Sequence, residues 1–317
     1  MEWRQLGRSG LRLSSIGLGT MTWGRDTDEH EAAEQFQVFL DAGGSLIDTA
    51  PTYADGAALQ LIGGLLQQVG RDDVVLSLRS GVARGRVDAS RGALLHSLDT
   101  SLRQLGTDYL DLWLVQAPDP NTPVYETLSA MARAVSSGRV RYLGLANHAG
   151  WQVAQVATLL RDDPGLAGIQ TEYSLLNRSA DGELLTAAAA LGVGAIAWSP
   201  LGRGVLSAKY RHSIPADSRA ASPHLRGFVE PYLSGQARTV VEALATAADG
   251  LGRAPVEVAL AWARDAAGID SVLVGARTPA QLKGSLAAVD FTLPEQIRTA
   301  LDEVADQAQA ASGTRRD

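Results

Sequence analysis

The chain has 317 residues, of which 45% are hydrophobic and 20% charged, a composition typical of one large globular domain or two ordinary ones. Its formal net charge of −7 disfavours sequence-independent binding to nucleic acid, which normally needs a basic surplus. The absence of cysteine excludes disulfides, thiolate metal sites and thiol nucleophiles. No apolar run approaches the ~18 residues that a membrane span needs, and residues 1–4 lack the pattern of a signal peptide. We therefore expect a cytoplasmic protein without nucleic-acid or membrane partners.

Short apolar runs alternate with helical patterns along the chain. The runs show no polar alternation, as expected of strands buried on both faces, and predict strands at 15–20, 46–50, 74–79, 110–116, 140–147, 168–174, 194–200 and 271–277. Amphipathic helical patterns follow them at 28–42, 59–69, 90–105, 124–137, 151–160, 181–191, 236–251 and 278–289. Eight such alternations predict a closed (β/α)₈ barrel, the TIM-barrel fold. The alternative is an open doubly wound sheet, but no Gly-x-Gly-x-x-Gly turn follows the first strand.

Four segments fall outside the eight units of the predicted barrel. Residues 2–12 predict a hairpin that caps one end, and 255–266 and 294–305 predict two extra helices. Residues 201–235 form a long connection after the seventh strand, a length typical of a lid. We interpret 1–317 as a single domain with a mobile tail at 308–317, where no apolar residue would anchor the chain.

Polar side chains gather where the predicted strands end. These residues are Thr20, Asp48, Tyr53, Arg79, Gln116, Asn147, Gln170, Glu172, Ser199 and Arg277. The carboxyl ends of barrel strands meet at one face, where TIM barrels carry their active sites. A ring of this kind predicts a ligand site.

Asp48, Tyr53 and Arg79 are the most informative members of this ring. Arg79 lies one strand from Asp48, so the two can pair and leave positive charge close to the Tyr53 phenol. A nearby cation favours the phenolate, and we expect it to lower the pKa of Tyr53 and make this residue a general acid or base. The alternative is an ion pair that braces the barrel rim while Tyr53 only packs.

Seven segments together resemble one family. They are 3–11, 16–24 (Ile-Gly-Leu-Gly-Thr-Met-Thr-Trp-Gly), 46–50 (Leu-Ile-Asp-Thr-Ala) with Tyr53, 138–147, 170–178, 198–204 (Trp-Ser-Pro-Leu-Gly-Arg-Gly) and 274–282. In this order the chain resembles the aldo-keto reductase superfamily from about residue 2 to 290. The resemblance implies a (β/α)₈ barrel that binds NADPH/NADP⁺ and uses a catalytic Asp, Tyr, Lys and His.

Two of those four catalytic positions are changed in this chain. Asp48 and Tyr53 match, whereas the lysine position falls on Arg79 and the histidine position on Gln116. Arginine keeps the positive charge and can fork onto a carboxylate, although it holds its proton more firmly than lysine. The Gln116 amide can only donate or accept hydrogen bonds, so it would orient or polarise the substrate oxygen.

The resemblance also implies the cofactor and substrate contacts. Asn147 and Gln170 would hold the nicotinamide carboxamide, Trp198 would stack on the nicotinamide, and Trp23, Tyr53 and Gln116 would face the substrate. The remaining cofactor positions are Gly19, Thr20, Asp48, Ser199, Leu201, Gly202, Arg203, Gly204, Lys209, Gly275, Arg277, Gln281 and Ser285, where serine replaces a family asparagine. Independently, Thr278-Pro279-Ala280-Gln281 predicts a helix start, an anion-binding position. Arg277 just before it suits a 2′-phosphate and favours NADPH over NADH.

We therefore expect an NADPH-dependent oxidoreductase. It would transfer hydride to a carbonyl or conjugated small-molecule substrate, with Tyr53 as general acid, and would have no metal site. The alternative is an NADP(H)-binding scaffold or redox-sensing protein with little or no turnover, because two catalytic positions are changed. The sequence leaves the substrate and the oligomeric state open.

Overall fold

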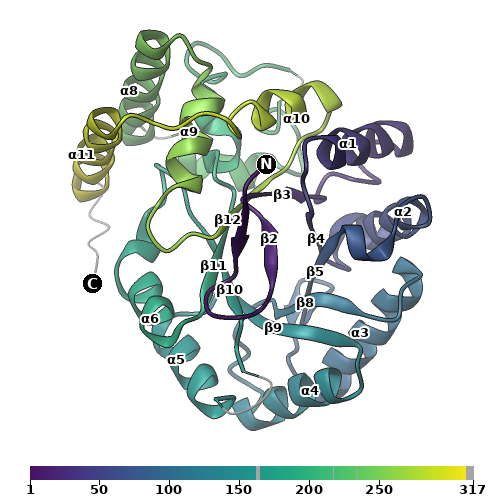
Figure 1. Cartoon of the computed structure of the whole chain (residues 1–317). Coiled ribbons are helices and arrows are strands. Elements are labelled where there is room, and N and C mark those ends of the chain that lie inside the picture. The colour runs from purple at the N-terminus through teal and green to yellow at the C-terminus, as the bar shows by residue number, and fades with distance from the viewer. Residues whose placement is uncertain (162–164, 217, 234, 312–317) are drawn as a thin grey trace.

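The computed structural model describes residues 1–161, 165–216, 218–233 and 235–311. Eight parallel strands close into a barrel in the order β10-β11-β12-β3-β4-β5-β8-β9, surrounded by helices (Figure 1). The strands are β3 (Ile16–Gly19), β4 (Leu46–Thr49), β5 (Val75–Ser80), β8 (Leu110–Val115), β9 (Val140–Ala146), β10 (Gly168–Glu172), β11 (Gly194–Trp198) and β12 (Ser271–Val274). The predicted TIM barrel is confirmed, and every expected strand contains the observed one or overlaps it closely.

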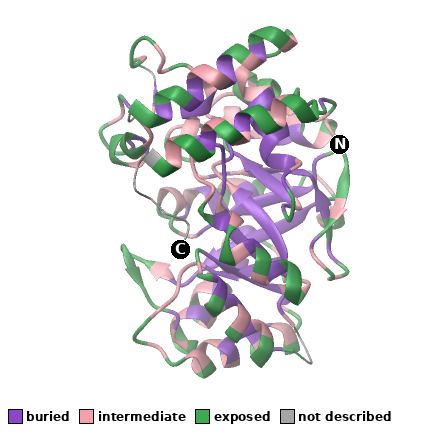
Figure 2. Ribbon diagram, turned by 90° about the vertical axis from the view of Figure 1, so that its left-hand side faces the viewer, coloured by how far each residue is buried: buried purple, intermediate pink, exposed green. Residues whose placement is uncertain are grey.

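One helix lies between most pairs of consecutive barrel strands. The helices that belong to the eight β/α units are α1 (Glu29–Asp41), α2 (Ala57–Leu66), α3 (Arg91–Leu105), α4 (Val124–Ser136), α5 (Gly150–Leu159), α6 (Glu183–Leu191), α8 (Gly235–Leu251) and α10 (Pro279–Leu286). Figure 2 shows the strands almost wholly buried, whereas the helices are buried on one side and exposed on the other. This burial explains why the strands are continuous apolar runs and the helices amphipathic.

The apolar core has an inner and an outer layer. Inside the barrel, Leu46, Leu112, Leu114 and Ile196 form one cluster with the leucines of the N-terminal hairpin. A larger cluster fills the space between the strands and the helices. The barrel is therefore packed through its centre, and room for a ligand is found only toward its end.

The predicted hairpin closes the end of the barrel where the strands begin. Strands β1 (Trp3–Gln5) and β2 (Arg12–Ser14) pair antiparallel, and the hairpin crosses the middle of the view in Figure 1. Gly7 is left-handed (φ +55°), and a Cβ built on it would lie 2.3 Å from the amide nitrogen of Gly194. Asp270 accepts the N–H groups of Gly7 and Ala195 at 3.0 and 3.1 Å. Only glycine fits this contact between hairpin and strand.

The two extra helices are α9 (Pro255–Arg264) and α11 (Glu295–Ala311). Residues 308–311 of the expected mobile tail are the last turn of α11, and residues 312–317 lie outside the described residues. The long connection at 201–235 contains α7 (Arg226–Val229) and the short 3₁₀ segments η4 (Gly202–Ser207) and η5 (Glu230–Tyr232). A second small hairpin, β6 (Val82–Ala83) with β7 (Arg86–Val87), was not expected from the sequence. Among the described residues, no helix has the length and apolar character to span a membrane.

Candidate active site

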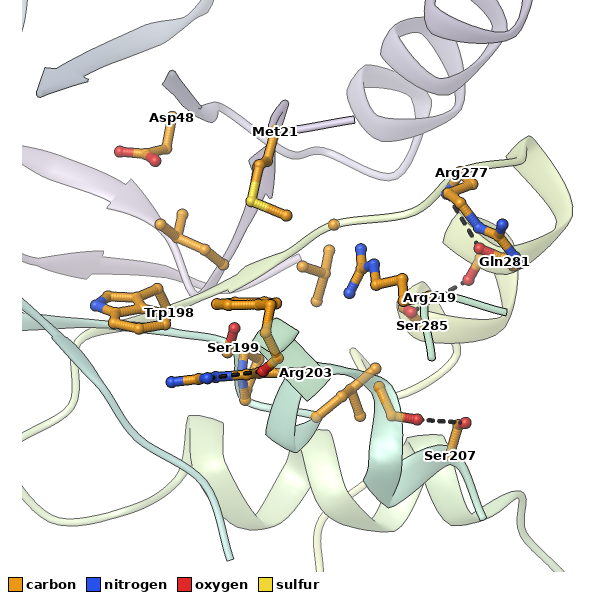
Figure 3. Close-up of a pocket in the computed structure, with 18 of the residues that line it drawn as sticks. Met21, Asp48, Trp198, Ser199, Arg203, Ser207, Arg219, Arg277, Gln281 and Ser285 are labelled. Atoms are coloured by element: carbon orange, nitrogen blue, oxygen red, sulfur yellow. Dashed lines mark hydrogen bonds between the residues drawn. The ribbon is translucent and has the colours of Figure 1, made fainter. Parts of the chain in front are cut away.

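A cavity of about 570 Å³ opens at the carboxyl ends of the barrel strands (Figure 3). Its volume lies in the range of small-molecule and cofactor sites. Its walls include many of the residues expected in the catalytic and cofactor sites, which are Gly19, Asp48, Tyr53, Arg79, Gln116, Asn147, Trp198, Ser199, Leu201, Arg203, Gly204, Lys209, Gly275, Arg277, Gln281 and Ser285. Residues from seven of the eight strand ends and from the long connection thus meet in one cavity.

A hydrogen-bonded group around the Asp48 carboxylate forms one end of the cavity. Asp48 is 2% exposed, and its Oδ1 accepts from Ser77 Oγ at 3.0 Å and from Gln170 Nε2 at 2.8 Å. Its Oδ2 accepts from Arg79 Nη2 at 3.1 Å, and the same nitrogen donates to the Tyr53 hydroxyl. The expected Asp48–Arg79–Tyr53 group therefore exists, and the buried carboxylate fixes the guanidinium beside the phenol.

The pKa of Tyr53 is raised, contrary to the sequence expectation. Removal of the phenol from water raises this pKa most, and the Asp48 charge adds to it. The Arg79 cation lowers the pKa of Tyr53, as expected, but by less than burial raises it. Arg79 is itself desolvated, yet facing Asp48 and Tyr53 raises its pKa, so it stays charged. At neutral pH the pair is therefore a protonated phenol beside a guanidinium cation.

Gln116, Asn147 and Trp198 form a connected part of the wall of the same cavity. Asn147 Nδ2 donates to the Gln116 carbonyl at 2.9 Å, and Trp198 Nε1 donates to Asn147 Oδ1 at 3.1 Å. These bonds fix the tryptophan ring and the asparagine amide in the cavity wall. The Gln116 side-chain oxygen is buried and has no hydrogen-bond partner among the described residues. An unpaired buried polar atom in a cavity wall favours a ligand that supplies the missing partner.

The backbone is strained at this cavity. Asn147, Ser199 and Arg203 line it with positive φ angles of 59°, 53° and 57°. Ala54 and Asp55, directly after Tyr53, are also left-handed. Residues with a Cβ adopt this conformation at a cost of about 1–3 kcal/mol each, and such strain concentrates at functional sites.

The opposite end of the cavity lies at the start of α10. Thr278 caps this helix, its side chain accepting the Gln281 N–H at 3.3 Å, as the sequence predicted. The Gln281 side chain accepts the N–H of Arg277 at 3.0 Å, and Ser285 Oγ donates to the Gln281 carbonyl at 3.1 Å. Arg277 thus stands at the start of α10, where its cation and the positive end of the helix dipole together favour an anion.

Arg219 is the most important cavity residue that the sequence analysis missed. It comes from the irregular connection at 201–235 and lines the cavity between the Asp48 end and Arg277 (Figure 3). Burial and the neighbouring Arg277 cation lower the pKa of Arg219. Neither arginine forms an ion pair within the described parts of the chain. Two unpaired guanidinium groups at one end of a cavity attract an anion, but no local motif marks Arg219 in the sequence.

Four of the expected contact residues do not line the cavity. Trp23 is fully buried and its Nε1 donates to Gln35 Oε1 at 3.1 Å, so the expectation that it faces substrate is wrong. Gly202 is buried in the turn beneath the cavity. Thr20 and Gln170 lie behind Asp48, donating to its carbonyl and carboxylate oxygens. The last two therefore support the cavity wall from behind.

Comparison with known proteins agrees with this geometry. The model of the Aldo/keto reductase family matches residues 15–306. A protein of Bacillus subtilis (strain 168) named "Uncharacterized oxidoreductase YrpG" is 34% identical over 321 residues, which cover 96% of each chain. A protein of Oryza sativa subsp. japonica named "Probable voltage-gated potassium channel subunit beta" is 32% identical over 320 residues, covering 98% of this chain and 96% of the relative.

Proposed function

The chain belongs to the aldo/keto reductase family, and from this premise we propose that it is an NADP(H)-dependent oxidoreductase that reduces the carbonyl of a small molecule to an alcohol. The observation that carries the proposal is the Tyr53 hydroxyl in the wall of the cavity, hydrogen-bonded to Arg79, whose guanidinium is in turn held by Asp48. NADPH would supply the hydride, and the residues of the chain would supply the proton and the positioning.

Tyr53 is the proton donor in this proposal. Its raised pKa keeps the phenol protonated, so it can donate to the carbonyl oxygen as that oxygen gains negative charge. The phenolate left behind faces the Arg79 cation, which stabilises it at the moment of transfer. Asp48 holds this cation in place and Ser77 and Gln170 in turn hold Asp48. Arginine in the lysine position therefore preserves the stabilising charge.

Gln116 would orient the substrate. It lines the same cavity as Tyr53, with its backbone carbonyl bonded to Asn147 and its side-chain oxygen unpaired. An amide can hydrogen-bond the substrate oxygen but cannot carry a proton as imidazole does. Tyr53 would therefore be the proton donor, and Gln116 a polarising and orienting group.

The opposite end of the cavity supports a phosphorylated dinucleotide. Arg277 stands at the start of α10 and suits the 2′-phosphate, whereas Arg219 lies nearer the middle, where the pyrophosphate would pass. The Gln170 side-chain oxygen is buried without a hydrogen-bond partner and lies beside Asp48. The Asn147 amide lines the cavity, so a nicotinamide carboxamide would have to share it with Gln116 and Trp198. Trp198 offers a fixed ring face toward the Asp48 end of the cavity. The cavity thus has cations and polar groups at the positions that NADP(H) would require.

The second candidate is a protein that binds NADP(H) with little or no turnover. Two observations favour it: the altered positions at Arg79 and Gln116, and a relative named as a probable potassium channel subunit. Both candidates require the cofactor, but only the first requires Tyr53 as an acid.

Oxidation of NADPH by a panel of aldehydes and ketones separates the two candidates. The wild type should oxidise NADPH with part of this panel, and Tyr53→Phe should lose that activity while it binds NADPH with unchanged affinity. Tyr125→Phe is the matched control, because this tyrosine is 69% exposed and lies outside the cavity wall. Equal activity of wild type and Tyr53→Phe would contradict the proposed role of Tyr53.

A further inference from the structure

Part of the cavity wall comes from the irregular connection after β11. Phe228, in the single-turn helix α7, lines the cavity, although this stretch of the chain has little regular structure of its own. Arg203 holds it: Nη1 donates to the Phe228 carbonyl at 2.7 Å. The guanidinium also lies 4.2 Å from the centre of the Phe228 ring and 5.0 Å from that of Tyr232. One side chain therefore packs against both ends of the segment 228–232.

Glu172, at the end of β10, anchors this arginine to the barrel. Arg203 Nε and Nη2 donate to the two carboxylate oxygens of Glu172 at 2.8 and 2.7 Å, a bidentate pair. Tyr232 donates to the same carboxylate at 3.1 Å. The side chains of Arg203 and Glu172 are only 17% and 11% exposed. Loss of either partner would leave the other charge mostly buried and unpaired.

The same guanidinium lies close to the tryptophan of the cavity wall. It is 6.0 Å from the centre of the Trp198 ring, and in the view of Figure 3 Trp198 lies between Asp48 and Arg203. The backbone of Arg203 is left-handed, between two glycines that are also left-handed. This turn directs the side chain back toward β10, where the contacts with Glu172 offset the unfavourable conformation.

We propose that Arg203, held by Glu172, is a positioning residue that fixes Phe228 and Trp198 in the cavity wall and thereby sets the affinity for the dinucleotide. This differs from the sequence expectation for Arg203, which made it a direct contact of the cofactor. Its guanidinium is already engaged by a carboxylate, so it acts on the ligand through the residues that it holds. The inference rests on the proposed function, because it takes NADP(H) as the occupant of the cavity.

The test uses Arg203→Met, Glu172→Gln and the double variant. Each single variant should raise the dissociation constant for NADPH about tenfold, and the double variant should do no more, because both changes break one interaction. KM for NADPH should rise more than kcat falls, since both residues act on binding through the wall that they hold and neither contacts the reacting atoms. Arg203→Lys should restore part of the affinity, because lysine keeps the charge but not the fork.

Limited trypsin digestion of the ligand-free protein gives a second, cofactor-independent measurement. Cleavage after Arg226 should be about tenfold faster in Arg203→Met and Glu172→Gln, because the segment would detach more often. Tyr232→Phe, which removes one hydrogen bond, should give a smaller increase and covers the case in which the other variants do not fold. Arg211→Met is the matched control. Arg211 lies on the same connection and forms a bidentate pair with Glu242 of α8, but it does not line the cavity.

The results distinguish this inference from the proposed function. A wild type that does not bind NADPH would contradict the proposed cofactor, and the cleavage rates would still decide whether Glu172 and Arg203 hold the segment. Wild-type affinity and wild-type cleavage in the Arg203 and Glu172 variants would overturn the inference. The inference would also be overturned if Arg211→Met weakened NADPH binding as much as Arg203→Met does, since a general loss of stability would then explain the effect.

Discussion

Replacing Arg277 by alanine should weaken NADPH binding and leave NADH binding nearly unchanged. Arg277 has no ion-pair partner within the described parts of the chain, so its guanidinium need not give up a carboxylate to bind phosphate. A hydrogen bond to a charged group contributes about 1.5–3 kcal/mol, which corresponds to roughly ten- to a hundredfold in affinity. NADH lacks the 2′-phosphate and should lose less than about threefold.

Arg219→Ala should have a different signature. Arg219 lies nearer the middle of the cavity, so it should contact a phosphate that both dinucleotides carry. Its removal should weaken NADPH and NADH to a similar degree, again by about tenfold or more. Titrations followed by tryptophan fluorescence measure the affinity of each arginine variant for NADPH and for NADH. Repeating them at a higher salt concentration screens the long-range attraction of surface charges, so that a direct contact with phosphate can be told apart from it.

The exposed Arg226, which lies outside the cavity wall, provides the control for both arginines. Arg226→Ala should leave both affinities within about twofold of the wild type. Equal loss of NADPH and NADH binding in Arg277→Ala would refute the assignment of this residue to the 2′-phosphate. Unchanged NADPH binding in Arg277→Ala and Arg219→Ala would refute the placement of the dinucleotide phosphates at this end.

Three further expectations concern pH, specificity and stability. Because the pKa of Tyr53 is raised above its usual value of about 10, the phenol stays protonated and carbonyl reduction should be flat from about pH 6 to 9. Alcohol oxidation, which needs the phenolate, should rise about tenfold per pH unit and still be rising at about pH 10. An alkaline fall in the reduction rate near pH 7–8 would contradict this. Gln116→His should raise kcat/KM for simple aldehydes by about tenfold, since imidazole adds a second group able to share a proton. Steady-state assays that show no gain would mean that Gln116 does not determine the specificity for these substrates. Gly7→Ala should lower the free energy of unfolding, measured in urea, by about 1–3 kcal/mol, because the new Cβ would overlap the backbone of Gly194. Gly64→Ala is the control and should not destabilise the protein, because a Cβ at Gly64 would have no atom within 4 Å.

The barrel could be predicted because its strands and helices carry different hydrophobic periods. Strand β8, for example, is buried at all six residues and reads as a continuous apolar run. The helix at Pro279 was also predictable, from a capping threonine and a proline at the first helical position. The second small hairpin at 82–87 was missed because its two-residue strands are too short to show a period.

The cavity residues were predictable where the chain leaves a strand, and less so elsewhere. Asp48, Arg79 and Asn147 follow directly from strand ends, which must meet at one face of the barrel. Arg219 and Phe228 come from the connection at 201–235, whose path depends on tertiary contacts such as that between Arg203 and Glu172. The pKa of Tyr53 was predicted with the wrong sign because the sequence shows the neighbouring cation but not the extent of desolvation. Burial is a property of the assembled fold.

A single-turnover reaction with deuterated NADPH tests the central claim most directly. Wild type and Tyr53→Phe are each saturated with NADPH deuterated at C4 of the nicotinamide and mixed with a carbonyl substrate found in the panel above. Mass spectrometry should find the deuterium in the alcohol product of the wild type, and about a hundredfold slower transfer in Tyr53→Phe at equal cofactor occupancy, the effect typical of losing a general acid. Transfer at the wild-type rate in Tyr53→Phe, or no transfer in the wild type to any carbonyl despite bound NADPH, would contradict the account.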